Sequence, residues 1–171
     1  MRKPRNRSIH KPLAMNHQPF WLKMSTKSRR AAREIALNVL YQIDVAKIPP
    51  DEALQTALEN TGMDKVAQEF TTALVKGVLE HMKVIDEKLK SLSIGWDPQR
   101  QPSVDRNILR MAMFEIIFLD HIPPSVSINE AVELAKKFST EDSGKFINGV
   151  LGTLVRQNTE GTKEEYVRTD T

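Results

Sequence analysis

The chain has 171 residues, enough for one domain of ordinary size with a tail. Hydrophobic residues make up 40% and charged residues 27%, a balance typical of soluble globular proteins. The longest strictly apolar runs, such as Ile116 to Leu119, are far shorter than the ~20 residues that span a bilayer. Cysteine is absent, which excludes disulfides, cysteine nucleophiles and thiolate metal sites and suits a reducing compartment. We therefore expect one soluble, cytoplasmic domain.

The charge is divided unevenly along the chain. Residues 1–33 contain ten lysines and arginines and no acidic residue. The remainder has 15 basic and 22 acidic residues, so the amino end carries +10 and the body −7. A cationic arm on an acidic body favours a polyanionic ligand such as nucleic acid. A disordered solubilising tail is the alternative.

Residues 1–24 are predicted to form a disordered basic tail. They contain three prolines and no apolar periodicity, and the apolar Phe20-Trp21-Leu22 is isolated. We expect this tail to contribute nothing to folding. Residues 159–171 are too poor in apolar side chains to pack and are predicted to be a flexible C-terminal tail, which leaves residues 25–158 as the domain.

The first half of the domain is predicted to contain three helices. Apolar residues between 29 and 46 fall on one stripe of a helix that ends before Pro49-Pro50. Asp51 is the expected N-cap of a second helix that reaches residue 60, and Gly62 follows in a left-handed C-cap conformation. Asp64 is the expected cap of a long third helix to residue 92, with a break near Met82 left open.

The second half is predicted to contain three more helices. A helix is predicted to start at Ser103, and its residues Ile108 to Leu119 are apolar almost all round, which indicates burial on most sides. Ser127 and Glu130 match a capping box that opens a helix to Phe138. Asp142 or Thr140 caps a last helix from Ser143 to about Arg156. Because no strand pattern appears, the expected fold is all-α, a single compact bundle of six or seven helices.

Three glycines fall inside predicted helices, where each costs about 1 kcal/mol relative to alanine. These are Gly77, Gly149 and Gly152. We expect close helix approach at these positions, with ligand contact as the alternative.

The sequence offers little support for catalysis. It contains no phosphate-binding glycine loop and no HExxH motif, and its four histidines are scattered. A metal site would need a cluster of ligands that is missing. We therefore expect a protein without cofactor, metal or enzymatic activity.

The most informative feature is the basic cluster at the start of the first helix. Arg33 lies four residues after Arg29 and three after Arg30, so the three share its first turns, and Lys27 precedes them. Positive charge at a helix N-terminus is disfavoured by the helix dipole, so folding alone gives no reason for the cluster. A phosphate backbone would give one. For Arg33, a side-chain stem that covers core surface is the alternative.

Four motifs together resemble the NusB family of bacterial transcription antitermination factors. They run from Arg29 to Gln42, Val104 to Glu115, Pro124 to Phe138 and Ser143 to Leu151. The resemblance covers about residues 27–157. Phe114 stands where the family often has tyrosine, Gly152 where it often has aspartate, and the amino-terminal tail is extra.

The resemblance implies a non-enzymatic, RNA-binding antitermination factor. Such a factor binds boxA-type single-stranded RNA in ribosomal RNA transcripts, pairs with the tenth protein of the small ribosomal subunit, and acts on the elongation complex of RNA polymerase. The family's RNA surface corresponds here to eight residues: Lys27, Arg29, Arg30, Arg33, Asp142, Lys145, Phe146 and Asn148. The face for the ribosomal protein would include Tyr41 and Asp105. From the residues alone, a core position for Phe146 is equally reasonable. Asn129 with Glu130 is expected to serve as capping chemistry and not as a binding site.

Two other functions stay open at this point. The same domain resembles the amino-terminal module of a ribosomal RNA cytosine methyltransferase, but this chain has neither the length nor the cysteine for the catalytic domain. A helical protein-interaction module with an incidental basic tail is the other alternative, and salt-dependent RNA binding would separate it from an RNA-binding protein.

Overall fold

The computed structural model describes the backbone of residues 19–93 and 97–169, with side chains, except that of Phe20, up to residue 159. A short 3-10 helix, η1 (Phe20–Lys23), precedes six α-helices. These are α1 (Thr26–Val45), α2 (Pro50–Glu59), α3 (Lys65–Leu92), α4 (Ser103–Phe118), α5 (Pro124–Phe138) and α6 (Glu141–Thr169). No strand occurs in these ranges, which confirms the all-α prediction. Within the described chain, none of the helices has the length and apolar character needed to span a membrane.

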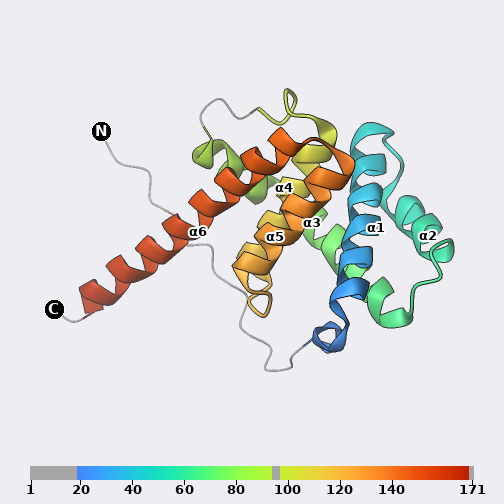
Figure 1. Ribbon diagram of the computed structural model, residues 1–171, viewed down its shortest axis with the longest axis horizontal. Helices are drawn as coiled ribbons and strands as arrows, with labels where there is room; N and C mark the ends of the chain where they lie inside the picture. The colour runs from blue at the N-terminus through green and yellow to red at the C-terminus, as the bar shows by residue number, and fades with distance from the viewer. Residues whose placement is uncertain (1–18, 94–96, 170–171) are drawn as a thin grey trace.

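The centre of the bundle is α4. Every residue from Asp105 to Glu115 is buried. The burial predicted for Ile108 to Leu119 is confirmed up to Glu115 and at Ile117, whereas Ile116, Phe118 and Leu119 are half-buried. It packs against α1, α3, α5 and α6. Figure 1 shows α5 between α6 and α1, with α2 on the outer side of α1. The two helices with predicted RNA residues, α1 and α6, are therefore separated by α5.

Several predicted helix ends are confirmed. Asp64 caps α3 by accepting a hydrogen bond from the backbone N–H of Ala67 at 2.8 Å. Gly62 has a φ of 61°, the left-handed conformation expected after α2. Helix α3 continues through Met82 without a break. Asp51 lies in the first turn of α2 and is not its cap, since Pro49 holds that position.

The predicted capping box at the start of α5 is wrong. The helix begins at Pro124, one turn before Ser127, because a proline fits the first helical turn, where its missing N–H has no partner to lose. Ser127 is buried and donates to a carboxylate oxygen of Glu115 at 2.6 Å, and Glu130 pairs with Arg30. Both side chains join α5 to other helices.

Helix α6 begins at Glu141, two residues before the predicted start at Ser143. Of the two predicted caps, Thr140 is confirmed, because its side chain accepts the N–H of Ser143 at 3.0 Å, whereas Asp142 lies inside the helix. The helix runs to Thr169, well past the predicted end near Arg156. The apolar pattern stops near Val155, so periodicity gave no sign of this continuation.

The prediction of a disordered tail over residues 1–24 does not hold for the segment directly before α1. Trp21 lies beside Phe70 of α3, with ring centroids 5.9 Å apart, and its Nε1 donates to Nε2 of His121 at 2.9 Å. Trp21 and Met24 pack against the core. A single partly buried aromatic residue produces no periodicity, which is why the pattern missed it. Residues 1–18 lie outside the described part of the chain.

The bond between Trp21 and His121 predicts a pH-dependent stability. Burial holds the pKa of His121 below its ordinary value, although Asp120 and Glu115 act in the opposite direction. The unfolded chain therefore takes up this proton more readily, so the stabilisation is complete above about pH 6.5 and is lost as the pH falls through the lower folded pKa. We expect the free energy of unfolding, measured in urea, to fall over this range. His121→Gln keeps an acceptor for Trp21 but cannot titrate there, so an equally steep fall in that variant would contradict the assignment.

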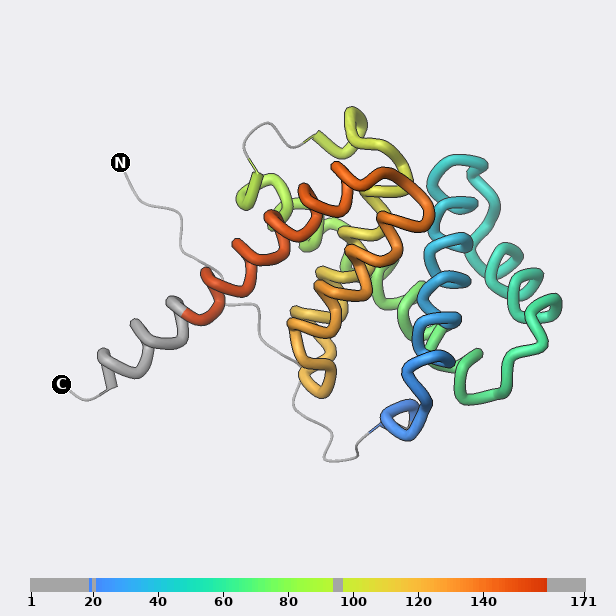
Figure 2. The backbone as a smooth tube through the Cα atoms, in the orientation of Figure 1, coloured from blue at the N-terminus to red at the C-terminus, as the bar shows by residue number. Residues whose placement is uncertain are grey.

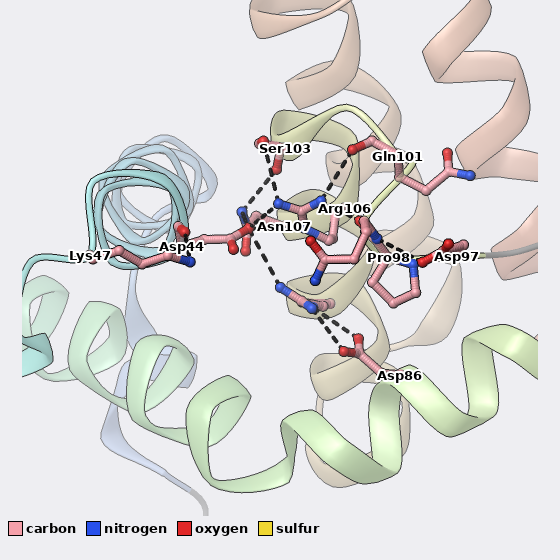
Figure 3. A network of polar contacts seen from close by, with 11 residues as sticks. Asp44, Lys47, Asp86, Asp97, Pro98, Gln101, Ser103, Arg106 and Asn107 are labelled. Atoms are coloured by element: carbon pink, nitrogen blue, oxygen red, sulfur yellow. Dashed lines mark hydrogen bonds and ion pairs between the residues drawn. The ribbon is translucent and has the colours of Figure 1, made fainter.

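A network of two buried arginines and two half-buried aspartates joins α1, α3, α4 and the 97–101 turn (Figure 3). Arg106 donates to Asp44 through Nε at 2.9 Å and Nη2 at 2.7 Å, and also to the carbonyl oxygens of Pro98 and Gln101. Arg110 donates to both carboxylate oxygens of Asp86, at 2.9 and 2.8 Å. Burial alone would raise the pKa of Asp44, but hydrogen bonds from Arg106 and Asn107 outweigh it and lower that pKa. The network fixes the end of α1 against the start of α4.

The glycine predictions have different outcomes. A Cβ at Gly77 would overlap the ring atoms of Phe114, so α3 and α4 approach closely there, as predicted. At Gly149 nothing lies within 4 Å, and at Gly152 only the Arg156 guanidinium does, at 3.7 Å. Close packing therefore explains Gly77 but neither of the other two.

Candidate nucleic-acid interface

The N-terminal turn of α1 carries exposed positive charge. Ser25 caps the helix by accepting the N–H of Ser28 at 3.1 Å, so Lys27 lies within the first turn. Lys27 is exposed and Arg29 half-buried. Neither side chain forms an ion pair within the described part of the chain. Both cations are thus available to a ligand, close to η1 (Figure 2).

Arg33 is not available in this way. Its side chain is 3% exposed and donates through Nε and Nη2 to the two carboxylate oxygens of Glu115, at 2.7 and 3.0 Å. Its guanidinium also lies over the ring of Phe70, 5.5 Å from the centroid. This burial contradicts the prediction that Arg33 contacts RNA and supports the alternative role in the core.

Arg30 has an intermediate position. Its side chain is 45% exposed, yet it donates to both oxygens of the buried Glu130, at 3.0 and 2.7 Å. The bonds from Arg30 lower the pKa of Glu130, so the pair is charged at neutral pH, and nearby Arg33 and Arg29 add to this effect. Arg30 therefore joins α1 to α5, and most of its charge is already neutralised.

The predicted residues of α6 lie at the surface. The Asp142 side chain is 95% exposed and has no capping role, and Lys145 lies near it, with Nζ 3.7 Å from a carboxylate oxygen. Phe146 is 37% exposed, so the expectation of a core position for it is wrong. Asn148 is exposed one turn further along. The first two turns of α6 thus present a cation, an aromatic ring and an amide.

The two predicted partner residues lie in different environments. Tyr41 is 40% exposed and lines a groove of about 610 Å³ between α1 and α2, together with Phe138 and Val104. Asp105 is only 4% exposed. One of its oxygens accepts a hydrogen bond from Ser143 at 2.7 Å, and the other has no partner within the described chain. Asp105 therefore supports the first turn of α6 from beneath the surface.

Sequence reasoning missed the carboxylates that hold the arginines. Glu115 and Glu130 are 82 and 100 residues from their partners, and no local spacing signals such a pair. The only available sign was an acidic residue inside an otherwise apolar helix, as Glu115 is. A buried carboxylate of that kind needs a cation, and the basic cluster was the obvious source.

The fold is an all-helical bundle. Its surface carries a cationic helix end, a second helix start with exposed polar side chains, and an apolar groove. These features define a protein that binds its ligands at its surface. The sequence model of the NusB family matches residues 30–156. The chain belongs to the NusB family.

Individual relatives agree. The chain is 49% identical over 133 residues to the transcription antitermination protein NusB of Pelotomaculum thermopropionicum, which covers 78% of this chain and 92% of that protein. It is 50% identical over 126 residues to NusB of Bacillus licheniformis, and this match covers 74% of this chain and 95% of that protein. Since nearly the whole length of these relatives is matched, neither is a module of a much longer enzyme.

Solved structures show the same fold. A crystal structure of the antitermination factors NusB and NusE in complex with double-stranded RNA contains a chain that matches with a TM-score of 0.72 and 31% identity, over 78% of this chain and 99% of that one. NusB of T. maritima matches with a TM-score of 0.70 and 35% identity, over 75% of this chain and 90% of that one.

Proposed function

We propose that the protein is a non-enzymatic transcription antitermination factor that binds boxA-type RNA. The observation that carries this proposal is the exposed Lys27 with the half-buried Arg29, two cations at a helix N-terminus where the helix dipole disfavours them. Family membership and the RNA in a relative's complex support it. The protein acts in the cytoplasm, where transcripts are made, and on the elongation complex of RNA polymerase.

The phosphate-binding role belongs to Lys27 and Arg29, with a smaller share for Arg30. Arg33 keeps α1 in place through Glu115 and does not touch RNA. The second RNA element is the start of α6, where Lys145, Phe146 and Asn148 are exposed. A cation, a ring for stacking and an amide for base edges are the groups that single-stranded RNA sites use.

The partner is the tenth protein of the small ribosomal subunit, NusE, and it docks in the groove beside Tyr41. Tyr41 and Phe138 leave a large apolar surface open there, edged by polar side chains such as Asn38. This combination is typical of protein interfaces. Asp105 contributes indirectly, through Ser143.

The double substitution Lys27→Ala with Arg29→Ala tests the phosphate-binding role. We expect weaker binding of boxA-type and scrambled RNA alike and a salt dependence that is flatter by roughly 1.4 in log–log slope, about 0.7 per lost contact on a single strand. Stability should change by no more than about 0.5 kcal/mol, since both residues lie at the surface. Lys83→Ala with Lys90→Ala on α3 is the matched control. An unchanged RNA affinity at low salt would contradict the proposal.

Asp142→Asn should tighten RNA binding. The carboxylate is almost fully exposed at the positive end of α6, where it repels phosphates, and Thr140 already caps the helix. Removing the charge therefore costs little stability and removes repulsion, most visibly at low salt. Fluorescence anisotropy with labelled RNA measures the change. If the variant, folded by circular dichroism, binds RNA no better than the wild type, the start of α6 is not part of the RNA site.

A further inference from the structure

The two proposed RNA elements lie at opposite ends of α5. Arg30 pairs with Glu130 and Glu34 with Lys137, so α1 and α5 run in the same direction and the cations of α1 lie at the start of α5. Helix α6 runs the other way, with Gly144 against Val132 near the end of α5. Figure 1 shows the same arrangement. A strand that contacts both elements must cross the exposed side of α5.

A groove follows this route. It lies between α5 and α6, with a volume of about 520 Å³. Its floor is apolar, formed by Ile128, Val132 and Gly144, and its rim carries Ser125, Asn129 and Asn148 from the two helices. From residue 125 to residue 136 the helix rises about 16 Å, room for a few nucleotides.

The polar side chains on the rim are free to bind. Asn129 and Asn148 are exposed, and neither forms a side-chain hydrogen bond within the described part of the chain. Each amide offers both a donor and an acceptor, the combination that recognises the edge of a base. Apart from the cations Lys136 and Lys145 and the acidic Glu141 towards the α6 start, the groove is uncharged.

We propose that the α5–α6 groove recognises a base of the bound RNA, with Asn129 and Asn148 on its two walls as the residues that determine sequence preference. This inference rests on the proposed function and assigns phosphate binding and base recognition to different residues. Lys27 and Arg29 hold phosphates, which position the strand without selecting sequence, and the groove supplies the selection.

The test compares Asn129→Ala and Asn148→Ala with the wild-type chain on two single-stranded RNAs, one boxA-type and one with the same bases in scrambled order. The preference for the boxA-type RNA should fall roughly five- to a hundredfold in each variant, the range for loss of one well-formed amide–base contact. The salt slope should stay unchanged, because no phosphate contact is removed. Gln55→Ala on α2 is the matched control and should keep the full preference.

The outcomes separate this inference from the proposed function. If the wild type prefers boxA-type RNA and both asparagine variants keep that preference, the groove does not recognise a base and the inference is wrong. A loss of affinity for both RNAs with a flatter salt slope would also overturn it, since that is the signature of phosphate binding. If the wild type shows no preference at all, the proposed function fails and the inference fails with it.

Discussion

Glu115→Ala should destabilise the protein by about 3–5 kcal/mol, the usual cost of removing one partner from a buried ion pair. Glu115 accepts two hydrogen bonds from Arg33 and one from Ser127, and all three side chains are buried. Without the carboxylate, the Arg33 guanidinium is left charged among apolar neighbours such as Phe70. Urea unfolding followed by circular dichroism measures the loss.

Two controls give this result its meaning. Glu133→Ala breaks an exposed pair with Lys136 and should cost no more than about 1 kcal/mol. Replacing both members of the buried pair, Arg33→Met with Glu115→Leu, should recover most of the lost stability, because no unpaired charge remains. A cost below about 1 kcal/mol for Glu115→Ala would show that the pair does not hold α1 to α4.

Gly77→Ala should lower the free energy of unfolding by about 1–3 kcal/mol, even though alanine is the better helix former by about 1 kcal/mol. The new methyl group would overlap the Phe114 ring. That ring cannot easily move, because His81 and Phe118 lie against it with centroids 5.8 and 5.6 Å away. The same urea titration measures this change.

The rescue of Gly77→Ala identifies the cause. In a Phe114→Ala background the space is open, so Gly77→Ala should become neutral or stabilising by up to about 1 kcal/mol. This double-mutant cycle isolates the contact between α3 and α4. Stabilisation by Gly77→Ala in the otherwise unchanged protein would contradict the close approach.

The sequence predicts what depends on short-range patterns. Helical periodicity indicated all six α-helices, and the caps at Asp64 and Gly62 follow from local chemistry. The start of α5 is an error of a different kind, because two local rules compete there. Ser127 and Glu130 match a capping box, but Pro124 in the first turn allows the helix to begin earlier.

The candidate site was only partly predictable, because ion pairs between residues far apart in the sequence decide which of its charges stay available to a ligand. Spacing placed Arg29, Arg30 and Arg33 together but could not show that Glu130 and Glu115 neutralise two of them. Likewise, Asp105 belongs to a matching motif, yet its burial depends on how α6 covers α4. The groove between α5 and α6 exists only once both helices are packed.

We claim that the cationic end of α1 and the start of α6 bind boxA-type RNA. The decisive measurement is a titration of the full chain into boxA-type and scrambled single-stranded RNA over a range of salt concentrations, with and without the tenth ribosomal protein. We expect tighter binding of the boxA-type RNA, an affinity that falls steeply as salt rises, and a further gain when the ribosomal protein is present. Equal affinity for both RNAs, or binding that does not respond to salt, would contradict the claim.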